Sequence, residues 1–123
     1  MKRKNPQGMS VDELIHRFAD IGMAQDGALL GNEIAKFTRL YHEMAAVVQE
    51  LRGREGDQRT ALLALYDHPN MQVRLKAAKN TLAVAPAAAR QAIEEIKRSK
   101  WFPQAGEAGM TLDFLDDGTF KPT

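Results

Sequence analysis

The 123-residue sequence predicts an all-α protein of about six helices in three antiparallel pairs. Composition is the first indication, because 18 Ala and 12 Leu residues outnumber the 16 Val, Ile and Thr residues together. Ala and Leu favour helices, whereas Val, Ile and Thr favour strands. Apolar residues also recur at steps of three and four, and a pattern of two helices repeats after 30 residues.

The composition limits the class of protein. A hydrophobic fraction of 44% over 123 residues predicts a folded chain, and we expect a single domain over residues 10–123. The absence of Cys excludes a disulfide framework, a thiolate metal site and a thiol nucleophile. It also fits a reducing compartment, so we expect a cytoplasmic protein. No apolar stretch approaches the roughly 20 residues of a membrane-spanning helix.

The N-terminal segment MKRKNPQGM is basic and has no apolar segment behind it. It therefore predicts a disordered basic tail over residues 1–9 and not a signal peptide. Met9 directly precedes the first helix signal, which makes it an alternative to Met1 as the start of the protein.

The first helix signal is the capping box that Ser10 and Glu13 form at the S-x-x-E spacing. It predicts a helix from about Val11 that ends between the mid-twenties and Leu30. Its apolar positions have helical spacing and are Val11, Leu14, Ile15, Phe18 and Ile21.

A second helix is predicted from an N-cap at Asn32 to Gly53. A regular seam of apolar residues could belong to a coiled-coil dimer, but its short length favours a hairpin with the first helix. The seam consists of Ile34, Phe37, Tyr41, Met44, Val48 and Leu51.

The second half of the sequence contains an internal repeat. The first copy predicts helices over residues 58–66, with Asp57 as the cap, and 71–84. The second copy predicts helices over residues 86–98 and 104–116, and Gly118 ends the last helix. The 30-residue shift places Leu63 on Ile93, Tyr66 on Ile96, Ala78 on Ala108 and Leu82 on Leu112.

The stretch LLALYDHPNMQVRLKAAKNTLAV resembles one HEAT or armadillo repeat. The resemblance implies that Asp67 and Arg74 interact around the turn between two helices and are structural. The sequence from Ser10 to Pro122, including WFPQAGEAGMTL and DDGTFKP, is similar to the bacterial family called "domain of unknown function 2019". That resemblance implies a right-handed α–α superhelix and a bacterial source, and it implies no activity.

Catalytic and cofactor motifs are absent from the sequence. His16, His42 and His68 lack a second ligand at metal-binding spacing, so we expect no metal site. The only serines are Ser10 and Ser99, and neither lies in a motif that would make it the nucleophile of a hydrolase triad. We therefore predict a protein without catalytic residues or cofactors.

The net charge of +1 conceals a basic band between two acidic segments. Residues 74–100 carry +5, whereas residues 10–50 carry −4 and residues 101–123 carry −3. The inward stripe of the helix over 71–84 leaves polar side chains, Gln72 among them, on its opposite face. We therefore predict a partner-binding surface, with an ordinary solvated face as the alternative; its residues are Lys76, Lys79, Arg90 and Lys97.

Trp101 and Phe102 occupy the turn of the second repeat. Aromatic side chains in small proteins most often close the end of a core, and that is the expectation here. If they are exposed, they become candidates for interface anchors.

The first functional hypothesis is a protein-binding module, immunity-like or adaptor-like, with a protein partner that could be acidic. The second is a nucleic-acid-binding domain that uses the basic band 74–100. A DNA glycosylase of the HEAT-like type ranks last, because no acidic residue near aromatic groups identifies one. The oligomeric state is open at this point, because an unpaired terminal helix pair could pair across a two-fold axis.

Overall fold

The computed structural model describes residues 5–123, and these residues are all-α with no strand among them. The chain divides into two compact units, one that ends at Ala61 and one that runs from Leu62 to Thr123. The all-α fold with paired helices is confirmed. The single domain over residues 10–123, the right-handed superhelix and the HEAT-like geometry stay predictions. Within residues 5–123 no helix is long and apolar enough to cross a membrane.

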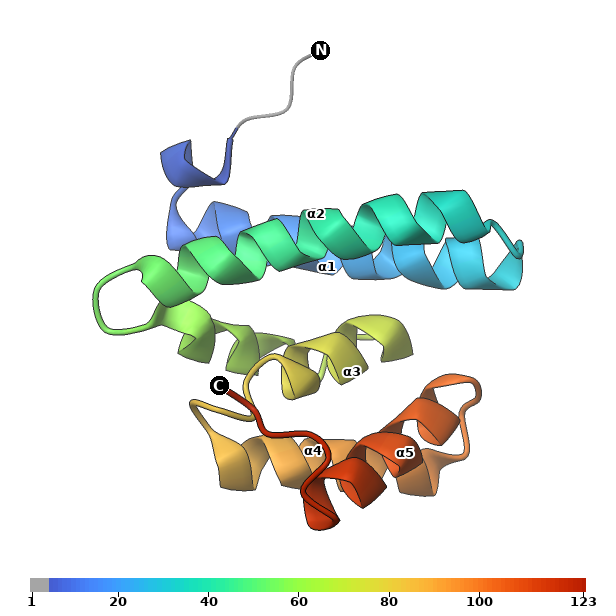
Figure 1. The fold of residues 1–123 in the computed structure, drawn as a ribbon. Coiled ribbons are helices and arrows are strands. Elements are labelled where there is room, and N and C mark those ends of the chain that lie inside the picture. The colour runs from blue at the N-terminus through green and yellow to red at the C-terminus, as the bar shows by residue number, and fades with distance from the viewer. Residues whose placement is uncertain (1–4) are drawn as a thin grey trace. The chain divides into compact units, whose positions relative to one another are not determined.

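The first unit is a hairpin of α1 (Val11–Leu30) and α2 (Ile34–Gly53), which lie side by side (Figure 1). The predicted capping box is present at the start of α1. The Ser10 hydroxyl accepts from the Glu13 N–H at 3.1 Å, and the Glu13 carboxylate accepts from the Ser10 N–H at 2.9 Å. Two orphan N–H groups are thereby satisfied, which fixes where α1 begins.

The start and the buried face of α2 differ from the prediction. Asn32 has a left-handed φ of 54°, and Glu33 occupies the N-cap position without a side-chain bond, so the predicted Asn32 cap is wrong. Ile34 is 73% exposed and Tyr41 is 58% exposed. The buried residues of α2 are Leu40, Met44, Val47 and Leu51, so of the predicted seam only Met44 and Leu51 are buried.

Part of the predicted disordered tail is ordered. Residues 1–4 lie outside the described residues, but Pro6–Gly8 form the 3-10 helix η1. The Arg54 guanidinium donates to the Met9 carbonyl at 2.6 Å and to the Pro6 carbonyl at 3.1 Å. The prediction is therefore wrong for residues 5–9, because a contact more than 40 residues away in sequence holds them.

The boundary between the units lies within η2 (Gln58–Leu65), a 3-10 helix where the sequence predicts an α-helix. The second unit continues with α3 (Met71–Lys79), α4 (Pro86–Ser99) and α5 (Gln104–Asp116). The last two match the predicted helices within one residue. The α3 helix is shorter than predicted, because the Thr81 carbonyl accepts from Val84 and Ala85 in a turn.

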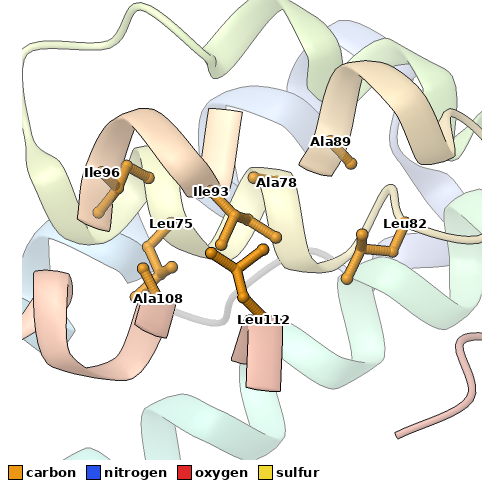
Figure 2. Close-up of a cluster of buried hydrophobic side chains, with 8 residues drawn as sticks. All are labelled: Leu75, Ala78, Leu82, Ala89, Ile93, Ile96, Ala108 and Leu112. Carbon is orange, nitrogen blue, oxygen red and sulfur yellow. The ribbon is translucent and has the colours of Figure 1, made fainter. Parts of the chain in front are cut away.

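The core of the second unit joins α3, α4 and α5, and Figure 2 shows its side chains. Positions 30 residues apart meet in this one cluster: Ala78 with Ala108, and Leu82 with Leu112. The small Ala residues allow the helices to approach closely. The internal repeat therefore predicted these two pairs of core residues, whereas Leu63 and Tyr66, which it matched with Ile93 and Ile96, are only partly buried and are not members of the cluster. The full cluster is Leu75, Ala78, Leu82, Ala89, Ile93, Ile96, Ala108 and Leu112.

Candidate interaction surface

Two of the four predicted partner-binding cations share one carboxylate partner inside the second unit. Lys76 Nζ lies 2.7 Å and Lys79 Nζ lies 3.0 Å from the same carboxylate oxygen of Glu107. The lysine side chains are only 14% and 28% exposed. The face of α3 that carries them was predicted to point outward, and that prediction is wrong because α5 covers it.

A buried amide pair extends the same contact between α3 and α5. Gln104 Nε2 donates to Gln72 Oε1 at 3.0 Å, and each residue is 1% exposed. Buried amides need such partners, because an unpaired polar group inside a protein is destabilising. Gln72 therefore belongs to the interior of the unit, although the sequence places it on a polar outer face.

The ion pairs shift the pKa values of their members. Burial by itself would raise the pKa of Glu107, but the ammonium groups of Lys76 and Lys79 outweigh it and bring the pKa below its usual value. Burial lowers the pKa of Lys76, and Glu107 offsets only part of this effect while Lys79 adds to it. The pKa of Glu107 falls because two ammonium groups attract its carboxylate and outweigh burial. The pKa of Lys76 falls because one carboxylate is not enough to outweigh burial and the repulsion by Lys79.

The other two cations of the predicted surface also pack against α5. Arg90 Nη1 lies 2.9 Å from Asp116 Oδ1, and the hydrogen bond from Arg90 lowers the pKa of that carboxyl group. The methylene groups of Lys97 lie against Gly109, where an added Cβ would be 3.8 Å from the Lys97 Cε. Lys76, Lys79 and Arg90 therefore meet the acidic groups of α5 and do not present one free basic face. The opposite charges of residues 74–100 and 101–123 were the signal that could have predicted this pairing.

The turn before α3 is held by hydrogen bonds to its backbone. Arg74 Nε donates to the backbone carbonyl of His68, and Asn70 caps α3 by accepting from the Val73 N–H at 3.1 Å. Within the described residues, Arg74 thus holds the turn through the backbone and not through the Asp67 carboxylate.

The histidines make local contacts. His16 Nδ1 lies 2.9 Å from the backbone carbonyl four residues earlier, and His68 Nδ1 accepts from the Asn70 N–H at 3.0 Å. The ring of His42 meets the ring of Tyr41 edge to face at 5.5 Å. In the part of the chain that the structure describes, no three His, Asp or Glu side chains gather at one point.

Trp101 and Phe102 do not close the core, which corrects the expectation from the sequence. Trp101 is 63% exposed and Phe102 is 68% exposed. Both follow Lys100, whose left-handed φ of 57° turns the chain out of α4. Ile93, Ile96, Ala108 and Leu112 fill the adjacent core, so the two aromatic rings have no place in it.

The outer face of α5 continues this exposed apolar surface. Phe102 lies against Gly106, since a Cβ added there would be 3.7 Å from Phe102 Cδ1. Met110 and Phe114 follow at steps of four residues, on the same face, and are 57% and 42% exposed. We call Phe102, Gly106, Met110 and Phe114 the α5 stripe. Its apolar character was visible in the sequence, but its exposure was not, because α5 has an apolar inner face as well.

Similarity to known proteins supports the fold and assigns no activity to this chain. Residues 12–116 match the family described as "Domain of unknown function (DUF2019)". The crystal structure of the protein RPA1889 from Rhodopseudomonas palustris CGA009 is similar, with 58% sequence identity and a TM-score of 0.95, over 98% of this chain and 100% of that one. Among proteins with curated descriptions, none matches this chain. Because the family match spans most of its residues, the chain belongs to the DUF2019 family.

Proposed function

We propose that this protein is a non-catalytic protein-binding module whose contact surface is the α5 stripe together with Trp101. The observation that carries the proposal is the apolar character of α5 on both of its faces. The inner face is buried through Ala105, Ala108 and Leu112, and the outer face exposes Phe102, Met110 and Phe114. An amphipathic helix at the surface of a protein has one apolar face, and a second one needs a partner.

The position of the stripe supports the same conclusion. A helix whose outer face meets solvent normally carries polar residues there. Here α5 exposes Met110 and Phe114, and Trp101 and Phe102 are exposed just before it; Trp, Phe and Met are residue types enriched at protein interfaces. Contiguous apolar surface of this kind is a mark of protein contacts. An immunity-like or adaptor-like role fits such a module.

The basic band offers less support for an acidic protein or a nucleic acid as the partner. Three of its cations, Lys76, Lys79 and Arg90, already have carboxylate partners within the unit. A nucleic acid would have to displace these partners before it gained the phosphate contacts that drive such binding. A partner that binds the apolar α5 stripe would not have to displace these carboxylates.

Site-specific photo-crosslinking in the native host tests the proposal. A photoreactive residue at position 110 should give adducts whose crosslinked partner is a polypeptide, which protease digests and nuclease does not. The same photoreactive residue at the exposed Asp20 of α1 should give no such adduct. The Phe114→Asp substitution should abolish the adduct formed at position 110. An adduct that nuclease shortens would favour the nucleic-acid alternative, and no adduct at position 110 would contradict the proposal.

A further inference from the structure

We infer that the α5 stripe binds the α5 stripe of a second copy of this chain, with the two helices antiparallel across a two-fold axis. This inference rests on the proposed function, because it names the partner of the same surface. A two-fold interface requires a surface that is complementary to itself, so that each residue faces a suitable residue of the other copy. The α5 stripe meets this requirement in its shape and in its charge.

The shape of the stripe matches itself in one antiparallel register. When the axis passes beside residue 108, Gly106 of one copy faces Met110 of the other, and Phe102 faces Phe114. Gly106 has no side chain, so the helix surface is low between Phe102 and Met110. The Met110 side chain is long and flexible, which suits it to fill such a hollow. The two outer positions then bring aromatic rings together, which is a favourable contact.

The charges at the two ends of the stripe also select this orientation. Asp113 and Asp117 are exposed near the C-terminal end of α5, and Arg98 and Lys100 are exposed just before its N-terminal end. Antiparallel pairing brings the acidic end of each copy to the basic end of the other. A parallel pairing would place the two acidic ends together, and such like-charge contacts reject wrong arrangements.

The absence of native Cys makes the register directly measurable. We would prepare the full chain as Gly106→Cys and as Met110→Cys, mix the two variants in equal amounts and oxidise them gently. In the proposed register, residue 106 of one copy lies opposite residue 110 of the other. Two identical variants would instead be offset by about 6 Å along the helix. A disulfide needs Cα atoms within about 7 Å, so the mixed disulfide is favoured.

The expected result is a mixed disulfide that exceeds each same-variant disulfide by about tenfold, where random pairing gives twofold. Mass spectrometry separates the three products, and circular dichroism of each variant shows that it is folded. Met23→Cys mixed with Met110→Cys is the matched control, because Met23 is an exposed methionine of α1 that the register does not place opposite residue 110, so the mixed disulfide should not exceed the twofold excess of random pairing. A random ratio from the 106 and 110 variants, or an excess of same-variant products, would overturn the inference.

The outcome of this test is separable from that of the proposed function. Self-pairing predicts that the photo-crosslinked adduct at position 110 has twice the mass of the chain. If that adduct instead contains a different protein and the cysteine variants pair at random, the protein-binding function stands and the second copy is excluded as its partner. If neither experiment gives a product, both proposals fail.

Discussion

Lys76 Nζ lies 2.7 Å from Glu107 Oε2, and this contact joins α3 to α5 across the face that the sequence assigned to solvent. The same carboxylate holds Lys79 at 3.0 Å. The contact sets two cations of α3 against one carboxylate of α5 and links the two helices. The opposite, apolar face of α5 is exposed through Met110 and Phe114.

Replacing Glu107 with Gln should therefore destabilise the protein. The substitution leaves the mostly buried ammonium group of Lys76 without its counter-charge. Breaking a fully buried pair is worth several kcal/mol, but the Glu107 side chain is 35% exposed and solvent screens it. We expect a loss of roughly 1–2 kcal/mol in the free energy of unfolding, measured by urea denaturation with circular dichroism.

Glu94→Gln is the matched control for this loss. Glu94 is likewise an acidic residue that faces a cation, but its contact with Arg90 is 3.8 Å long and both side chains are at least 40% exposed. Its substitution should change the free energy of unfolding by less than about 0.5 kcal/mol. Equal effects of the two substitutions would contradict the account of the Lys76 and Glu107 contact.

The same carboxylate predicts how stability depends on pH. The two ammonium groups bring the pKa of Glu107 in the folded protein below the ordinary value of 4.5. The unfolded chain therefore takes up its proton first as the pH falls. The stabilisation by Glu107 is fully present above about pH 4.5 and is lost as the pH falls through the lower folded value. The difference in urea midpoint between wild type and Glu107→Gln should thus shrink from neutral pH to about pH 3. A difference that is the same at both pH values would refute this prediction.

Arg54 gives a prediction for the N-terminal segment. Its guanidinium holds the carbonyl groups of Pro6 and Met9, and Glu50 holds the guanidinium at 2.8 Å. Arg54→Lys keeps the charge but loses the fork of donors, so residues 5–9 should open more often. Hydrogen exchange of the Gly8 and Met9 amides, which bond within this segment, should become several-fold faster.

Arg52→Lys serves as the control for the exchange measurement. Arg52 is an exposed residue of the same last turn of α2. Its substitution should leave the Gly8 and Met9 amides unchanged. If both variants accelerate their exchange equally, Arg54 does not hold the segment.

The core of the second unit gives a prediction about stability that follows directly from the sequence pattern. Ile93 is fully buried in the cluster that joins α3, α4 and α5, so Ile93→Ala removes packed methyl groups and leaves a cavity. We expect a loss of roughly 2–5 kcal/mol in the free energy of unfolding. Ile34→Ala removes the same side chain from a position that is 73% exposed and lies outside the α5 stripe, and it should change the free energy of unfolding by less than about 0.5 kcal/mol.

Local patterns predicted the elements of this fold well. The capping box of Ser10 and Glu13, the bounds of α4 and α5, and the pairing of Ala78 with Ala108 in the core all follow from short-range spacing and the repeat. Such features depend on neighbours within a few turns of the chain. The sequence contains those neighbours, so it is sufficient to predict them.

The features that were wrongly predicted depend on contacts distant in sequence. Lys76 and Gln72 look like surface residues until α5 supplies Glu107 and Gln104 as partners. The segment around Pro6 looks disordered until Arg54 binds its carbonyl groups. A polar or charged side chain is compatible with burial whenever a partner meets it, and single-sequence patterns do not reveal that partner.

Sedimentation equilibrium tests most directly the central claim that the α5 stripe is a contact surface for a second copy. With rising concentration, the apparent mass of the wild type should move from 13.7 kDa toward twice that value. Met110→Asp, which places a charge at the centre of the stripe, should stay at 13.7 kDa with an unchanged circular dichroism spectrum. A wild type that remains at 13.7 kDa throughout, or a variant that associates as the wild type does, would contradict the claim.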